Sequence, residues 1–67
     1  MFELWINDKI DSFGKYSVSM VKLDDAGRIE KAFVLKLCSS KDEQSEYAED
    51  FGAFMGYTPK ERSLNNN

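Results

Sequence analysis

A turn between two apolar, alternating segments constrains the fold of this chain more than any other feature. The turn lies at residues 24–27 (Asp-Asp-Ala-Gly), where aspartate suits the first positions and Gly27 supplies the positive φ that closes a short loop. Apolar residues recur along residues 15–23 before the turn and along residues 28–38 after it. The pattern predicts an antiparallel β-hairpin over residues 15–38.

The apolar residues of the hairpin are not in one register throughout. In the first segment they change parity, from Val18 and Met20 to Val21 and Leu23. A β-bulge near Met20 and Val21 would restore the alternation. In the second segment, one face is predicted to carry four apolar side chains: Ile29, Phe33, Leu35 and Leu37.

A capped helix is predicted over residues 40–55. Ser40 suits the N-cap and Glu43 follows three residues later, which forms a capping box. Gly56 suits the residue after the helix, and Pro59 cannot continue it. One apolar stripe is expected on this helix, consisting of Tyr47, Ala48, Phe51, Phe54 and Met55.

Gly52 interrupts the helical pattern at a cost of about 1 kcal/mol relative to alanine. The glycine indicates close packing of the helix on a strand, and the alternative is a notch for a partner.

The sequence predicts an α+β fold. A small antiparallel β-sheet, made of the hairpin and an N-terminal strand over residues 2–6, is packed by the C-terminal amphipathic helix in the order β-β-β-α. A helix over residues 2–12, giving α-β-β-α, is the alternative. Residues 1–57 are predicted to form one small domain, and residues 58–67 a flexible polar tail.

The residue content argues against an enzyme. The chain of 67 residues has no histidine, so no imidazole can act as the base for a serine or cysteine nucleophile. Its single cysteine, Cys38, forms no internal disulfide and no zinc site, and it is expected to be a structural thiol at the end of a strand. No cofactor or metal site is predicted.

The expected setting is the cytoplasm. No apolar run approaches the roughly 20 residues that cross a bilayer, so no membrane partner is expected. The N-terminal residues lack the basic start and apolar stretch of a signal peptide. One unpaired thiol also fits a reducing compartment.

The acidic stretch at residues 42–50 is the strongest functional feature. It has five acidic residues and no basic one, in a chain of net charge −3, and the helical pattern gives one aromatic face and one acidic face. The acidic face is predicted to dock on a basic surface patch of a larger protein. The predicted partner-binding residues are Asp42, Glu43, Glu46, Glu49, Asp50 and Trp5. Trp5 is expected either to anchor the second face of the sheet or to contact the partner.

By analogy of class only, such chains are often accessory proteins of bacteriophages or mobile elements that inhibit or modulate a host macromolecule. Two alternatives remain. The chain could bind nucleic acid through basic residues of the hairpin, namely Lys22, Arg28, Lys31 and Lys36. Acidic residues interrupt that set, which makes nucleic acid the weaker expectation. A homodimer that pairs edge strands across a two-fold axis is compatible with either function.

Overall fold

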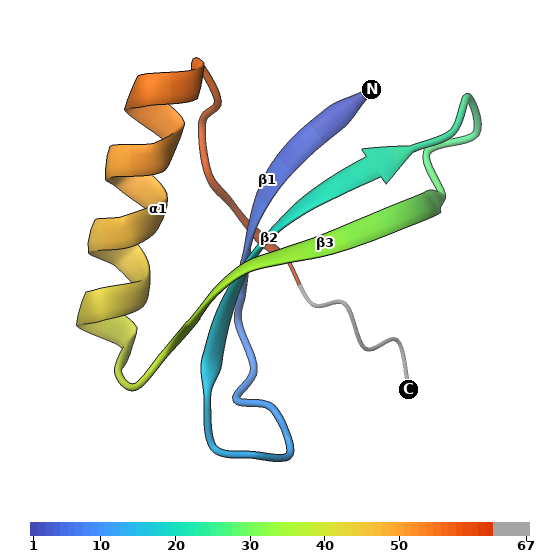
Figure 1. The fold of residues 1–67 in the computed structure, drawn as a ribbon. Helices are drawn as coiled ribbons and strands as arrows, with labels where there is room; N and C mark the ends of the chain where they lie inside the picture. The colour runs from blue at the N-terminus through green and yellow to red at the C-terminus, as the bar shows by residue number, and fades with distance from the viewer. Residues whose placement is uncertain (63–67) are drawn as a thin grey trace.

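The chain folds into one four-stranded β-sheet with one helix against it (Figure 1). The computed structural model describes residues 1–62. The elements in chain order are β1 (Phe2–Asn7), β2 (Tyr16–Leu23), β3 (Ile29–Cys38), α1 (Lys41–Met55) and β4 (Lys60–Arg62). The predicted α+β class and the hairpin are confirmed, and the N-terminal segment is a strand rather than a helix.

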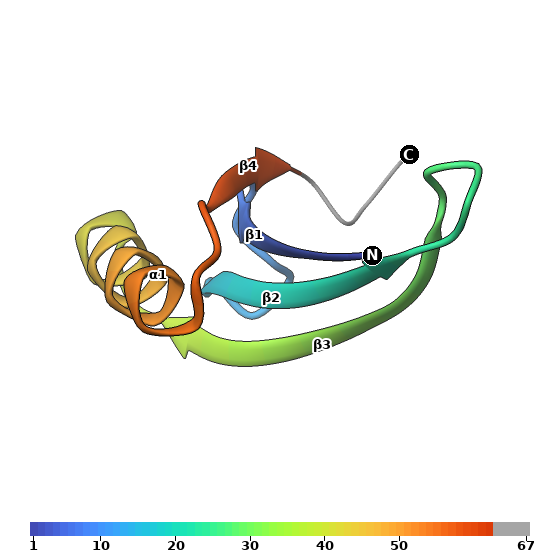
Figure 2. The same ribbon diagram turned by 90° about the horizontal axis from the view of Figure 1, so that it is seen from above.

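The sheet is mixed rather than wholly antiparallel. Its strand order is β3-β2-β1-β4, and β4 runs parallel to β1, with Trp5 opposite Lys60 and Asn7 opposite Arg62 (Figure 2). The prediction of a polar tail from residue 58 onward is therefore wrong for residues 60–62; residues 63–67 lie outside the described part. The Lys-Glu-Arg sequence of β4 carries no strand signal of its own, and its pairing depends on where the end of α1 brings the chain.

Two irregularities lie in β3, and not near Met20 and Val21 as predicted. The partners of Val18 and Ser19 are Lys36 and Val34, so Leu35 is an extra residue in β3. In the same way the partners of Lys22 and Leu23 are Lys31 and Ile29, and Glu30 is the extra residue. The side chains of β2 therefore alternate regularly between the two faces, and the extra residues at both register shifts lie in β3.

Both faces of the sheet bury side chains, which explains the change of parity in β2. On the face toward α1, Leu4 and Val18 are fully buried and pack with Ala48 of the helix. On the opposite face Val21 is fully buried, and Trp5 is only 7% exposed. A strand between two buried faces has apolar residues on both parities, so no bulge is needed in β2.

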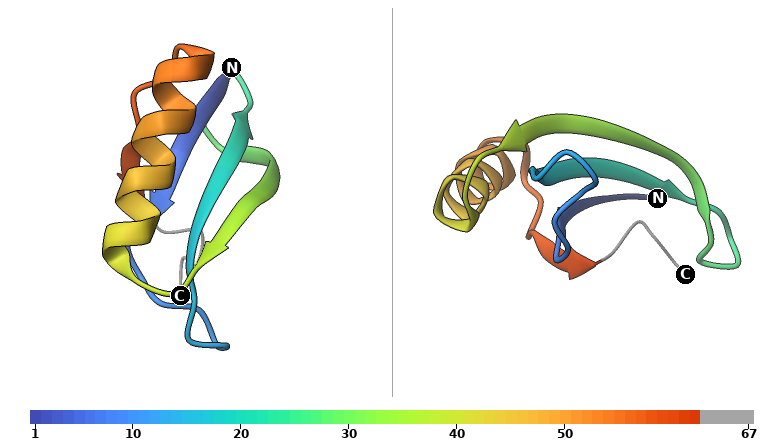
Figure 3. Two further views of the ribbon diagram at one scale, coloured as in Figure 1. Left: turned by 60° about the vertical axis from the view of Figure 1, so that its left-hand side comes forward. Right: turned by 90° about the horizontal axis from the view of Figure 1, so that it is seen from below.

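The predicted apolar face of β3 is not buried. Phe33 and Leu37 are about half exposed, at 51% and 52%, and the bulge at Leu35 places them on opposite faces of the sheet. Leu35 itself packs against the core. Figure 3 shows β3 at the edge of the sheet, with its turn end far from α1 and its other end leading into the helix.

The helix begins and ends where the sequence predicts. The Ser40 hydroxyl accepts a hydrogen bond from the Glu43 amide at 3.1 Å, and the Glu43 carboxylate accepts one from the Ser39 amide at 2.8 Å. At the other end Gly56 has a φ of 82°, and its amide donates to the Gly52 carbonyl. Within residues 1–62, no helix has the length and apolarity needed to cross a membrane.

The face of α1 that touches the sheet differs from the predicted aromatic stripe. Its buried residues are Gln44, Ala48 and Gly52, spaced four apart. Gln44 is 2% exposed, and its Nε2 donates to the carbonyl oxygens of Asn7 and Ser17, both at 2.8 Å. One amide group thus ties the helix to the end of β1 and the start of β2 and satisfies two buried carbonyls.

Gly52 lies where the chain returns from the helix toward β4. A Cβ atom at this position would collide with the carbonyl oxygen of Tyr57 and lie 3.3 Å from both Leu4 Cδ2 and Pro59 Cδ. The close-packing interpretation of Gly52 is therefore confirmed, with the loop before β4 as the main neighbour.

Gly52→Ala is expected to destabilise the fold, although alanine favours a helix by about 1 kcal/mol over glycine. The added methyl group would force apart the helix and a backbone carbonyl, and such overpacking costs roughly 1–3 kcal/mol. Urea unfolding would measure the change, with Ser45→Ala at an exposed position of α1 as the control. A Gly52→Ala protein as stable as the wild type would contradict the described packing.

An ion pair between Lys60 of β4 and Glu3 of β1 joins these two strands. Lys60 Nζ lies 2.9 Å from Glu3 Oε2, and the other carboxylate oxygen of Glu3 accepts a hydrogen bond from Trp5 Nε1 at 2.9 Å. The bond from Lys60, followed by that from Trp5, lowers the pKa of Glu3 below its ordinary value of 4.5.

This pair predicts a pH-dependent effect of Lys60→Met. A lowered folded-state pKa means that the pair stabilises the fold above pH 4.5 and ceases to do so as the pH falls through the lowered pKa. Lys60 is 46% exposed, so the loss at pH 7 is expected to stay below about 1 kcal/mol. Urea unfolding should show the difference from wild type shrinking on acidification, and a constant difference would argue against the ion pair.

Candidate functional site: an acidic aromatic groove

An open groove of about 400 Å³ runs along α1 on the side toward the end of β3. Its lining residues are Lys36, Glu43, Glu46, Tyr47, Asp50, Phe51 and Phe54. All of them except Lys36 come from the helix. The sequence pattern placed the acidic and aromatic side chains on separate faces, whereas the structure interleaves them along one groove.

The rotation of the helix explains this arrangement. Because Gln44, Ala48 and Gly52 face the sheet, the aromatic stripe lies at the margin of the contact. Tyr47 and Phe51 are half-buried against the core, and their rings stack with centroids 6.0 Å apart and planes 13° from parallel.

Phe54, the third ring of the groove, is not part of the core. It is 87% exposed, although its sequence position continues the stripe of Tyr47 and Phe51. The prediction that it belongs to the buried stripe is therefore wrong. A large aromatic side chain in water beside two half-buried rings is available for contact with another molecule.

The carboxylates of the groove have no cationic partner among residues 1–62. Glu43, Glu46 and Asp50 lie three and four residues apart, on one side of α1. The ion pairs of the described chain join Lys22 to Glu30, Arg28 to Asp24 and Lys60 to Glu3, and none of them uses α1. Among residues 1–62, Lys36 is the one basic residue that lines the groove. The groove thus combines an apolar floor with a net negative charge.

The other predicted partner-binding residues lie elsewhere. Asp42 and Glu49 are exposed on α1 but do not line the groove. Trp5 is buried on the sheet face opposite the core around Ala48, and its indole nitrogen is bonded to Glu3. The structure therefore supports its packing role, and only a small part of the residue reaches the surface, where it lines a second open pocket with Glu3 and Arg62.

The sequence pattern predicts the aromatic residues of α1 as part of the core, whereas they line the site. The signal that could have revealed it is the second stripe, Gln44, Ala48 and Gly52, whose small residues permit the closest approach of a helix to a sheet. For Lys36 the sequence predicts a place in the basic hairpin, because its position near the end of β3 does not indicate that α1 lies beside it.

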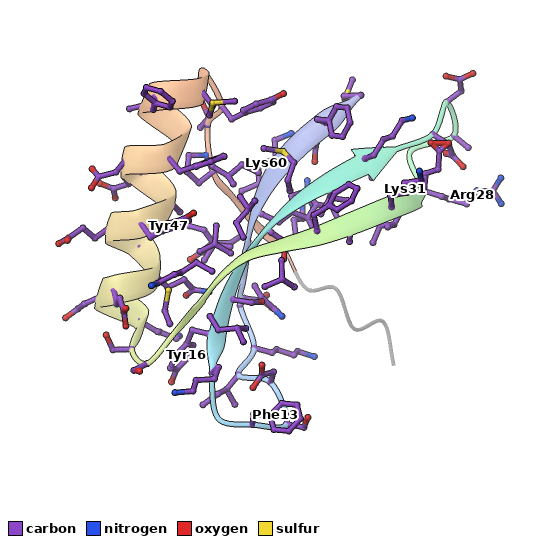
Figure 4. All side chains as sticks on the ribbon, in the orientation of Figure 1. Phe13, Tyr16, Arg28, Lys31, Tyr47 and Lys60 are labelled. Carbon is purple, nitrogen blue, oxygen red and sulfur yellow. The ribbon has the colours of Figure 1, made fainter. Side chains whose placement is uncertain are left out.

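The basic residues of the alternative site do not form one patch. Lys22 lies 3.3 Å from Glu30, and Arg28 lies 3.6 Å from Asp24, so both charges are offset locally. Arg28 and Lys31 lie toward the turn end of the hairpin, away from Tyr47 and α1 (Figure 4). Lys36, at the other end of β3, lines the groove instead.

Cys38 and the acidic side chains are the remaining candidates for reactive or metal-binding groups. Cys38 is fully buried, and this burial raises the pKa of its thiol, which disfavours the reactive thiolate. Within residues 1–62, no group of three or more His, Cys, Asp or Glu side chains is placed to hold a metal ion.

Comparison with protein-family models, with curated proteins and with solved structures gave no match for this chain. What the groove can bind must therefore be inferred from its own residues.

Phe54→Ser is expected to leave the free energy of unfolding within about 0.5 kcal/mol of wild type, because the ring is exposed. The matched variant Phe51→Ser should cost roughly 2 kcal/mol or more, since this ring packs on the core. Urea unfolding of both variants would measure the contrast. A large loss with Phe54→Ser would mean that this ring is structural.

Proposed function

We propose that this chain is a small, non-enzymatic protein-binding module whose groove on α1 holds a basic, partly apolar segment of a larger protein. The observation that carries the proposal is the meeting of three carboxylates with three aromatic rings in one open groove. Carboxylates attract lysine and arginine, while the rings accept the aliphatic parts of those side chains and, by cation–π attraction, their charges.

The two components of the groove have different effects on binding. The negative charge attracts a basic partner from a distance and so raises the association rate. The rings of Tyr47, Phe51 and Phe54 supply apolar area that is removed from water in the complex, and aromatic residues are frequent among those that dominate interface energies. The groove therefore favours a segment with both charge and apolar surface over a purely ionic one.

A role in inhibiting or modulating a host macromolecule follows from the same chemistry. Closely spaced carboxylates on a helix resemble the charge pattern of a nucleic-acid backbone, so they can compete for a basic binding surface. In this proposal the chain is an accessory protein of the kind that bacteriophages and mobile elements encode, and it acts in the cytoplasm. Its small size, its acidic helix and its single buried thiol support this assignment.

The non-enzymatic part of the proposal rests on the residue types. The sequence has no histidine, and Cys38 is fully buried with a raised pKa. The groove carboxylates lie on an open helix surface, without the enclosed cleft that acid–base hydrolysis of a substrate requires.

Glu46→Lys and Glu49→Lys form a matched pair for testing the groove. Both are exposed glutamates of α1, and only Glu46 lines the groove, so the two variants change the net charge equally. The Glu46→Lys protein is expected to bind its partner about tenfold or more weakly, because one attraction becomes a repulsion. Glu49→Lys should bind nearly as wild type.

The measurement is affinity capture from a lysate of the host, with and without nuclease, followed by titration of the captured protein against each variant. Circular dichroism would show that both variants keep the fold. If both variants lost affinity equally, the effect would come from overall charge rather than from the groove. If both kept wild-type affinity, the groove would not be the binding site. A capture that disappears with nuclease would instead favour nucleic acid and the basic hairpin.

A further inference from the structure

The two edges of the sheet differ in length and chemistry. The edge formed by β4 is three residues long, and all three side chains are charged. The edge formed by β3 is ten residues long, and among residues 1–62 its only neighbour is β2. Four large apolar side chains of this edge are 38–57% exposed, namely Ile29, Phe33, Val34 and Leu37. A long edge with exposed apolar residues is the kind that pairs with another strand.

The bulges of β3 give this edge a particular pattern of faces. Lys31 lies opposite Lys22, and Glu30 forms an ion pair with Lys22, so both point to the helix side of the sheet. Lys36 lies opposite Val18, and Leu35 packs with the core around Val18. Each bulge therefore places two successive residues on the same face.

These two doublets, residues 30–31 and 35–36, are equally far from Phe33 along the strand. Phe33 itself lies opposite Met20, on the helix side, while Ala32 and Val34 lie on the other face. The pattern of faces along β3 is thus symmetric about Phe33.

We propose that the chain forms a two-fold dimer in which the β3 strands of two copies pair antiparallel with Phe33 at the centre. The two sheets then become one sheet of eight strands. In this register every residue faces a residue on the same side of the sheet: Phe33 faces the partner's Phe33, Ala32 the partner's Val34, Lys31 the partner's Leu35, Glu30 the partner's Lys36, and Ile29 the partner's Leu37.

The facing residues are also chemically complementary. Glu30 and Lys36 form two opposite-charge pairs, one at each end of the interface, and Ile29 and Leu37 form two apolar pairs. The central Phe33 rings continue the row of Leu4 and Met20 from one copy into the other. A register shifted by one residue places Phe33 opposite residues of the other face, and a shift of two residues sets a doublet against a regularly alternating pair.

Charge exchange across the dimer tests both the interface and its register. Glu30→Lys and Lys36→Glu are each expected to raise the dimer dissociation constant about tenfold, because each places like charges opposite one another twice. The double variant E30K/K36E restores both pairs and should return to near wild-type dimerisation. Lys31→Glu makes the same charge change as Lys36→Glu but faces the partner's Leu35, so it should have little effect.

Sedimentation equilibrium over a range of protein concentrations would give these constants. A wild-type chain that stays monomeric throughout would overturn the dimer. A dimer that the single reversals leave intact, or that the double variant does not restore, would overturn this register. None of these outcomes depends on whether the groove on α1 binds a protein.

Disulfide formation offers a second test of the register. Directly opposite residues of antiparallel strands have Cα atoms about 4.5–5.5 Å apart, within reach of a disulfide. Phe33 is about half exposed in the monomer, so a cysteine at this position would be accessible. The Phe33→Cys variant should therefore oxidise to a covalent dimer. Val34→Cys is the control, because the two copies of residue 34 would lie about two positions apart, beyond easy bridging. Equal cross-linking at both positions would contradict pairing centred on Phe33.

Discussion

The close approach of α1 to the sheet is the constraint on which the rest of the structure depends. It is made by three residues four apart: Gln44, which bonds two strand carbonyls, Ala48 in the core, and Gly52, which has no room for a side chain. A larger residue at position 48 would push the helix away from the sheet, and one at position 52 would collide with the loop before β4. Because Gln44 joins the end of β1 to the start of β2, the contact fixes the position of the helix along the strands as well as its rotation.

That rotation creates the groove. A helix that turned Tyr47, Phe51 and Phe54 to the sheet would bury its rings and leave an acidic outer surface, as the sequence suggested. With small residues at the contact, the rings move to the margin and meet the carboxylates of Glu43 and Asp50. The exposure of Phe54 is thus a consequence of tight packing elsewhere on the same helix.

Local features were predictable from the sequence, and long-range ones were not. The turn before Gly27, the cap at Ser40 and the end at Gly56 each depend on a few neighbouring residues, and the structure confirms them. The pairing of β4, the bulges of β3 and the burial of Trp5 depend on how distant segments meet. The same division holds at the site, where charge alone indicates the acidic residues, but the helical pattern predicts their aromatic neighbours as core.

Lys36 links the groove to the edge of the sheet. It is the one cation of the described residues that lines the groove, and in the proposed dimer it faces the partner's Glu30. An ion pair there would offset the positive charge beside Glu43 and Glu46 and make the groove more attractive to a basic ligand. Binding free energies are reciprocal, so a basic ligand in the groove would in turn favour the dimer. The bulge that brings Leu35 and Lys36 to one face thereby connects two surfaces that the sequence presents as separate.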